Sequence, residues 1–470
     1  MAQPKQNTPN TTPKTPEAMM LIASFGFSCY ILWEIIGMFE MLPYLPSHLD
    51  FELLLFQRPL GFFALAVSFL GALGASRFLI KHLDILMTIA ALSSFLTLIS
   101  SMLATFFVSS SLFSSALAWV FFGISLSSTM LLWAVFFSSF YTPSLHYVML
   151  IGFTAAIVVF LGLSFTGALQ HLYVFIGFLL ITTTLAISGF FLYSLTSVLK
   201  ENTGKPKPMR PAVMLHSGAY GIVYGFSLAF LVMLGENASF IAAGSALVGC
   251  VAAWLIARKR KIYDNIYIRR ITFAPVVVAL IFIPIGGNAS YMICSFLIIS
   301  ACFCTALTSW IITAEAASRL HLNPVAIFTN YKFSSWTGIF VGMAIGSFVI
   351  LTGEESFSLV VTVMTALICL TFAVLELSME RNAKNQDAAN DKITRYRKCC
   401  QEVAQQYSLS ARELEVLYFL AKGRNAEYIA LELYIAKPTV KTHIQHIYQK
   451  TNVNSQQALI DVVEHQGKPV

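Results

Sequence analysis

Charged residues are scarce in this chain of 470 residues: Asp, Glu, Lys and Arg together make up 11%, whereas hydrophobic residues make up 57%. This composition excludes an ordinary soluble protein, in which about a quarter of the residues are charged. The few charges are also unevenly placed, because they cluster in the N-terminal tail, in short loops and after Glu380. We therefore predict a membrane protein whose polar C-terminal part begins after residue 380.

The sequence also lacks the residue patterns of metal sites and of common catalytic sites. Its 8 cysteines lie mostly within apolar runs and show no framework spacing, which excludes a disulfide scaffold and a zinc site. It contains no phosphate-binding glycine loop and no nucleophile elbow. We expect neither an enzyme nor a bound metal or cofactor. The net charge of +7 suits an anionic partner, either lipid headgroups or nucleic acid.

Long apolar runs fill the region from residue 18 to residue 380, after a polar tail (1–17) that we expect to be disordered. Runs of roughly 20 residues are long enough for a helix to cross a bilayer. They predict about twelve spans, at residues 18–42, 58–77, 84–107, 114–139, 145–168, 172–198, 212–234, 238–257, 271–286, 288–313, 324–351 and 356–378.

The basic residues predict the orientation of these spans. Cytoplasmic loops of membrane proteins are enriched in Lys and Arg. Alternate loops here hold Arg77 and Lys81, the basic segment 200–210 and the basic segment 258–270, while the opposite loops are acidic apart from Arg58. The chain is therefore expected to be a multi-pass protein of the cytoplasmic membrane with both termini in the cytoplasm.

The loop "KENTGKPKPMRP" divides the spans into two sets of six. This layout resembles the major facilitator superfamily (MFS), which implies two six-helix halves around a central cavity. Between the second and third spans, "GALGASRFLIKHL" keeps Gly71, Arg77 and Lys81 of the family pattern. Ala75 and Ser76, however, stand where the family has an acid and an arginine. Because that acid helps the halves move during transport, the departure puts active transport in doubt.

Ionisable residues inside spans are costly in lipid and often functional. Glu34 and Lys332 lie well inside predicted spans and are candidates for the wall of a ligand cavity, with an unknown small molecule as partner. The alternative is that each only pairs with a neighbouring helix. Glu40 and Arg58, near span ends, are expected to form a structural ion pair.

The predicted linker (381–408) begins with a polar stretch and continues as a short helix. Its apolar residues recur three and four positions apart, which places them on one stripe: Ile393, Tyr396, Cys400, Val403 and Tyr407. The stripe would pack on a second subunit or on the domain that follows. Two heptads are few for a coiled coil, so the second alternative is favoured.

The segment 409–466 predicts four short helices. Ser410 with Glu413 forms a capping box, Gly423 ends the first helix, Asn425 caps the second and Pro438 opens the third. The fourth starts near Ser455. The apolar spacing predicts these buried residues: Leu414, Leu417, Leu420, Ala421, Ile429, Ala430, Leu433, Val440, Ile444, Ile447, Ala458, Leu459 and Val462.

The third helix of this segment has a polar outer face. Lys441, Thr442, Gln445 and Gln449 lie opposite its buried stripe. Lys can contact guanine or phosphate and Gln can contact adenine, as in a helix-turn-helix. A solvated helix face has a similar pattern, so spacing alone leaves both interpretations open.

The residues themselves resemble the LuxR-type (NarL-like) DNA-binding domain. The matching features are "RELEVL" from Arg412, Gly423, Ile429-Ala430 and "TVKTHIQHIYQK" from Thr439. The resemblance implies double-stranded DNA as partner, with Lys441, Thr442 and Gln445 facing the groove. It also implies that Lys437, Thr439 and Lys450 approach phosphates, on a homodimer that binds paired half-sites.

Three positions depart from that pattern. Ala436 replaces the usual serine before the recognition helix, which weakens its N-cap by roughly 1 kcal/mol. Thr451 replaces a leucine and Gln456 replaces a common arginine.

We thus expect an all-α protein: a polytopic bundle of two six-helix halves, with a four-helix LuxR-type helix-turn-helix domain at the C-terminus. The leading hypothesis is a membrane-anchored one-component transcription regulator that senses a ligand or membrane signal through its spans. The alternatives are an MFS-type transporter of a small solute with a regulatory DNA-binding tail, and a regulator whose spans serve only as an anchor.

Overall fold

The computed structural model of this protein forms two compact units, which divide between residues 373 and 374. The described residues of the first unit are 17–39, 51–106, 111–139, 145–166, 176–189, 211–231, 234, 237–258, 265–283, 288–319, 322–352 and single positions from 359 to 373. In the second unit they are 374, 377, 396, 398–433 and 435–466. The expectations for the tail, Glu40 and the basic loops 200–210 and 259–264 fall outside these ranges.

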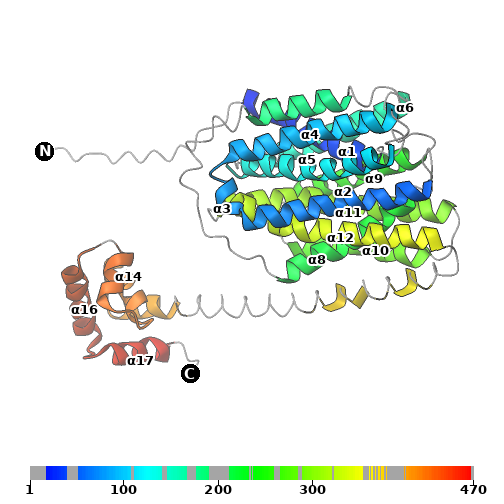
Figure 1. The fold of residues 1–470 in the computed structure, drawn as a ribbon. Helices are drawn as coiled ribbons and strands as arrows, with labels where there is room; N and C mark the ends of the chain where they lie inside the picture. The colour runs from blue at the N-terminus through cyan, green and yellow to red at the C-terminus, as the bar shows by residue number, and fades with distance from the viewer. Residues whose placement is uncertain are drawn as a thin grey trace. The chain divides into compact units, whose positions relative to one another are not determined.

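The described residues of the first unit form a bundle of long helices, together with one helix of 4 residues (Figure 1). They are α1 (Glu17–Phe39), α2 (Phe51–Gly74), α3 (Ser76–Leu79), α4 (Leu83–Phe106), α5 (Ser111–Ser139), α6 (Leu145–Thr166), α8 (Pro211–Leu231), α9 (Asn237–Arg258), α10 (Asn265–Phe282), α11 (Asn288–Arg319) and α12 (Pro324–Thr352).

The described part of the chain contains 9 helices that are long and apolar enough to cross a membrane. Two shorter apolar helices, Ile176–Gly189 and Ile271–Phe282, fall on the predicted sixth and ninth spans. The twelfth predicted span (356–378) lies largely outside the described residues. The remaining eleven predicted spans are therefore all represented by apolar helices.

Helix contacts repeat between the two halves of this bundle. In the first half α1 contacts α6, and α5 contacts both α2 and α4; in the second half α8 contacts α12, and α11 contacts both α9 and α10. Counted by predicted span instead of by helix label, each pair in the second half is a pair of the first half moved on by six spans. Between the halves, α2 contacts α12 and α6 contacts α9. These two contacts are equivalent, because α2 corresponds to α9 and α6 corresponds to α12. The predicted division into two related halves is thus confirmed by how the helices pack.

Glycines allow α8 and α12 to approach each other closely. A Cβ atom added to Gly221 or Gly225 of α8 would overlap the backbone of α12. One added to Gly338 or Gly342 of α12 would overlap the backbone of α8. Small residues at such spacing let helix backbones come into contact, where dispersion stabilises the pair in lipid.

The second unit contains α14 (Ala411–Leu420), α15 (Ala426–Glu432), α16 (Lys437–Thr451) and α17 (Gln456–Gln466). Their predicted ends are confirmed. The Ser410 hydroxyl accepts a hydrogen bond from the Glu413 N–H at 3.3 Å, and the Ser410 N–H donates to Glu413 Oε2 at 2.7 Å. The Asn425 side chain accepts from the Tyr428 N–H at 2.9 Å, and Gly423 has a φ of 75°.

This unit has a hydrophobic core of its own. Leu417, Ile429, Val440, Ile447 and Leu459 are fully buried, as predicted. The remaining predicted residues are buried (Leu420 and Ala421) or half-buried (Leu414, Ala430, Leu433, Ile444, Ala458 and Val462). The sequence reasoning missed the fully buried Val416 and Val463, although the four-residue interval from Val416 to Leu420 placed Val416 on the buried side.

The apolar stripe of the predicted linker helix packs on this same core. Cys400 and Val403 are fully buried within it, and Tyr396 and Tyr407 pack against it. The ring centroids of Tyr396 and Tyr418 lie 5.9 Å apart. The stripe therefore packs on the domain that follows, while Ile393 lies outside the described residues.

We expect Gly342→Leu to separate α8 from α12, because the new side chain would overlap the carbonyl oxygen of Ile222. Thermal unfolding of the purified protein in detergent should show a midpoint several degrees lower, as expected for overpacking that costs about 1–3 kcal/mol. Gly162→Leu is the matched control, since no atom lies within 4 Å of a Cβ added there. Equal midpoints for the two variants would contradict the close packing.

Candidate functional site

The outer face of α16 is polar and exposed. Lys441, Thr442, Gln445 and Gln449 are all exposed, as is Thr439 in the first turn. On the opposite side of the helix, Val440 and Ile447 are fully buried against the domain core. The structure thus presents the predicted groove-facing residues together on one accessible surface.

The start of α16 lacks a side-chain cap, as predicted. Ala436 occupies the N-cap and forms no side-chain hydrogen bond, while Pro438 stands in the first turn. Lys437 Nζ lies 3.4 Å from Glu427 Oε2, and both side chains are more than half exposed, at 51% and 69%. Because exposed ion pairs contribute little, Lys437 can exchange this partner for a phosphate at small cost.

Lys450 occupies a different environment from the other predicted contacts. Its Nζ donates to Glu413 Oε2 at 2.7 Å and to the Ser408 carbonyl at 3.2 Å. The Glu413 side chain is only 5% exposed, and its other oxygen lies 3.7 Å from His446 Nδ1. Lys450 therefore connects the end of α16 to the start of α14, with one of its three ammonium protons left for another acceptor.

The other two departures from the LuxR pattern also form hydrogen bonds inside the domain. Thr451 is buried and its hydroxyl donates to the Ile447 carbonyl at 2.7 Å. Gln456 Nε2 donates to the Leu420 carbonyl at 2.7 Å and to the Arg424 carbonyl at 3.1 Å. These bonds satisfy polar groups that replace an apolar and a basic side chain.

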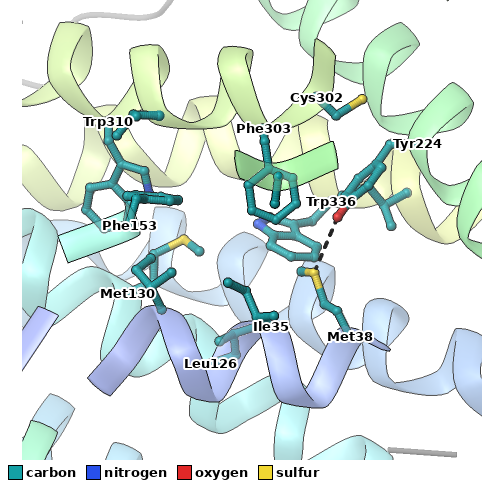
Figure 2. Close-up of a cluster of buried hydrophobic side chains, with 14 of the residues drawn as sticks. Ile35, Met38, Leu126, Met130, Phe153, Tyr224, Cys302, Phe303, Trp310 and Trp336 are labelled. Atoms are coloured by element: carbon teal, nitrogen blue, oxygen red, sulfur yellow. Dashed lines mark hydrogen bonds between the residues drawn. The ribbon is translucent and has the colours of Figure 1, made fainter. Parts of the chain in front are cut away.

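A cavity of about 130 Å³ lies between the two halves of the first unit. Its wall comes from α1 and α6 of the first half and from α8, α11 and α12 of the second. Figure 2 shows part of its apolar surroundings, among them Met38, Phe303 and Trp336, and the hydrogen bond of 3.8 Å from the Tyr224 hydroxyl to the Met38 sulfur.

Glu34 and Lys332 both line this cavity, although about 300 residues separate them in sequence. The two side chains interact electrostatically. Lys332 is 6% exposed, and its Nζ lies 5.4 Å from the centroid of the Trp310 ring. Glu34 Oε2 is buried and has no hydrogen-bond partner among the described residues. The structure thus places the two predicted candidates in one site.

Arg58 was expected to pair with Glu40, which lies outside the described residues. In the structure its buried guanidinium donates to the carbonyl oxygens of Met38 on α1 and Leu228 on α8, the second at 3.5 Å. Arg58 therefore connects the two halves at the end of the cavity where α1 and α8 terminate.

A second polar connection lies at the other end of the bundle. The Asn323 side chain, 1% exposed, donates to the Ser76 carbonyl at 3.2 Å and accepts from the Ala326 N–H at 3.3 Å. Ser76 is one of the residues that depart from the MFS pattern. The halves are thus joined here by an uncharged group. Sequence reasoning missed Asn323, since an asparagine just before a helix reads as an ordinary cap.

The C-terminal domain is similar in sequence to known DNA-binding regulators. Residues 407–463 match the family described as bacterial regulatory proteins, luxR family. A probable transcriptional regulatory protein NarL of Mycobacterium tuberculosis is 50% identical over 52 residues, which are 11% of this chain and 24% of that protein. The oxygen regulatory protein NreC of Staphylococcus carnosus is 43% identical over 53 residues, again 11% of this chain and 24% of the relative. The chain therefore spans about a quarter of the length of these relatives, and carries a LuxR-type helix-turn-helix domain.

The membrane part is similar in fold to solved transporters. A bacterial homologue of the iron transporter ferroportin, in the outward-facing state, superposes with a TM-score of 0.54 at 15% identity, covering 78% of this chain and 99% of that one. The human organic anion transporter MFSD10 superposes with a TM-score of 0.53 at 13% identity, covering 77% and 100%. At such identities the likeness shows the fold alone, a helical bundle of the kind seen in these two transporters.

The environment of Glu413 makes a testable contribution to stability. Burial raises the pKa of its carboxyl, but hydrogen bonds from Lys450 and Ser410 outweigh this and leave the pKa below the ordinary value. A carboxyl with a lowered folded-state pKa stabilises the fold above its unfolded-state pKa of about 4.3. The contribution is lost as the pH falls through the folded-state value.

We expect Glu413→Gln to lower the unfolding free energy of the segment 396–470 by about 2 kcal/mol at neutral pH, because a charged hydrogen-bond network is lost. The difference from wild type should shrink below about pH 4, as measured by urea unfolding across pH. Glu415→Gln is the control, since its ion pair with Arg412 is half-exposed. A difference that stays constant down to about pH 2 would contradict the role of the ionised carboxylate.

Proposed function

We propose that the chain is a membrane-anchored one-component transcription regulator that binds a small molecule between its two halves and binds DNA through α16. The observation that carries this proposal is the exposed polar face of α16 on a LuxR-type domain that continues from an MFS-fold bundle whose cavity is lined by Glu34 and Lys332. A DNA-reading surface and a ligand-sized cavity in one chain are the two components that a one-component regulator requires.

On DNA, we assign Lys441, Thr442 and Gln445 to base edges in the major groove, since their exposed side chains share the face opposite the buried stripe. Gln449 extends that face by one turn. We assign Lys437 and Thr439, at the helix start, to phosphate contacts. Lys450 contributes to phosphate binding through its remaining proton, and chiefly holds α16 against α14 through Glu413.

The assignment of α16 to DNA has consequences for the oligomeric state and for the orientation in the membrane. One polar helix face gives modest affinity, so a homodimer on paired half-sites is proposed. The chain would span the cytoplasmic membrane with both termini in the cytoplasm, in accordance with the basic loops that hold Arg77 and Lys81. DNA binding requires this orientation, because the chromosome lies on that side.

The route of the signal is proposed to run through the helix around residues 396–407. Its Cys400 and Val403 are fully buried in the C-terminal core, and its Tyr396 contacts Tyr418 of α14. A displacement of this helix would therefore act directly on the packing of the DNA-binding domain, and so on dimerisation or on the exposure of α16.

The alternative function is transport of a small solute, with the DNA-binding domain as a regulatory tail. The fold shared with transporters supports it. The departure of Ala75 and Ser76 from the acid and the arginine of the family pattern counts against it. Uptake or efflux by residues 1–380 in proteoliposomes would establish transport. If instead the isolated C-terminal domain gave the full ligand response, the spans would be only an anchor.

We expect Lys441→Ala to reduce specific DNA binding by roughly 10- to 100-fold, since one good base contact contributes about 1–3 kcal/mol of discrimination. Promoter occupancy by the full-length protein, measured by chromatin immunoprecipitation, tests this. Lys398→Ala is the matched control, because that side chain is 76% exposed on the helix before the domain. Unchanged occupancy by the Lys441 variant at equal membrane abundance would refute the groove assignment.

A further inference from the structure

The residues that line the cavity between the halves carry balanced charge, and the Arg58 guanidinium lies outside this lining. Of the residues that line it, Glu34 is the acid and Lys332 the primary amine, and the two side chains interact. The net charge of the pair is zero whether the proton lies on the lysine or on the carboxylate. The wall also contains a histidine, His216, whose ring packs on the rings of Tyr220 and Phe372 with centroids 4.7 Å and 5.2 Å away.

A balanced pair in a membrane interior selects against ligands with a net charge. A cation beside Glu34 would leave Lys332 without its counter-charge, and an anion beside Lys332 would do the same to Glu34. An uncompensated charge in such surroundings costs several kcal/mol. A molecule without net charge avoids this cost, whichever end of the pair it contacts.

The pair also retains unused hydrogen-bonding capacity. Glu34 Oε2 is buried and accepts no hydrogen bond of normal geometry among the described residues; the buried Tyr30 hydroxyl interacts with this carboxyl without such a bond, so Oε2 can accept one from a ligand. Lys332 Nζ lies over the ring of Trp310 at 5.4 Å and near that of Tyr331 at 5.9 Å, contacts that use no acceptor atom. One ligand group with a donor beside an acceptor would satisfy both side chains.

The remaining wall limits the size of the ligand and the nature of its body. The cavity measures about 130 Å³ and is bordered by the rings of Phe153, Trp310 and Trp336. An apolar cavity of about 150 Å³ accommodates benzene. The space therefore fits one ring with a small polar substituent, lying against aromatic side chains.

We propose that the cavity binds a net-neutral, single-ring molecule that carries a hydrogen-bond donor next to an acceptor, as a primary carboxamide does. The donor binds Glu34 on α1 and the acceptor binds Lys332 on α12, so that the ligand connects the two halves. This inference rests on the proposed function for its consequence in DNA binding, and on the cavity alone for the class of ligand.

Three probes of matched size and different charge test it: benzamide (neutral), benzylamine (cation) and benzoate (anion). Binding to the full-length protein in nanodiscs is followed by the fluorescence of the cavity tryptophans and by calorimetry at about pH 7.5, above the usual titration of histidine. We expect benzamide to bind at least 10-fold more tightly than either ion, which is about 1.4 kcal/mol.

Two variants then reverse the preference. Glu34→Gln leaves the lysine unbalanced, so benzoate should become the tightest of the three probes. Lys332→Met leaves the carboxylate unbalanced, so benzylamine should become the tightest. Asp84→Asn and Lys81→Gln are the matched controls, since both residues are exposed and outside the cavity wall, and they should keep the wild-type order. The order of three probes within one preparation does not depend on how much of the protein is folded.

The proposal is overturned if wild type prefers an ion, if it binds none of the probes, or if the two cavity variants keep the wild-type order. DNA binding by the same nanodisc preparation separates this outcome from the proposed function. Specific DNA binding without any benzamide binding would refute the proposed ligand class and would leave the proposed regulator function standing. Benzamide binding that leaves DNA affinity unchanged, with the expected reversals, would support the ligand class and count against sensing through the spans.

Discussion

Most of the membrane part follows from one constraint: a polar group in hydrocarbon must find its partner within the protein. Hydroxyl groups of the spans find acceptors on their own helix: the Thr97 hydroxyl, for example, donates to the Ser93 carbonyl at 2.8 Å. Groups that cannot be satisfied on their own helix reach across the bundle. Arg58 donates to carbonyls on α1 and α8, and Asn323 donates to Ser76, so the same constraint joins the two halves at both ends of the cavity.

The C-terminal domain lies outside that constraint and is stabilised differently. Its core of fully buried residues such as Leu417 and Ile447 gives it the usual hydrophobic driving force in water. One buried charge, Glu413, connects three features at once, since it caps α14, pairs with Lys450 of α16 and lies near His446. The salt bridge from Lys450 therefore joins α16 to α14, while Lys441 and Gln445 are exposed on the polar face of α16.

The fold could be predicted well from sequence because apolar run length and capping residues are local signals. The capping box at Ser410 and the cap at Asn425 could be predicted from residues three positions apart. The division into two halves could be predicted from the polar loop near residue 205. Contacts between distant residues could not be derived in this way. Nothing in the sequence near Arg58 indicates the carbonyls of Met38 and Leu228, and spacing alone could not show that Lys450 faces Glu413 rather than solvent. Glu34 and Lys332 could each be selected by their cost in lipid, but only the packing of α1 with α8, α11 and α12 brings them to one cavity.

That cavity is lined by helices of both halves, so a ligand bound there would contact both. A ligand shifts an equilibrium only by its difference in affinity for the two states. The polar connections that Arg58 and Asn323 make at the two ends are hydrogen bonds, and a typical hydrogen bond contributes about 1 kcal/mol net. A molecule that joins Glu34 of one half to Lys332 of the other adds a contact of comparable size, and each 1.4 kcal/mol changes the ratio of states about tenfold. On the proposed function, a binding site that both halves share is therefore what lets a small molecule act on the relation between them.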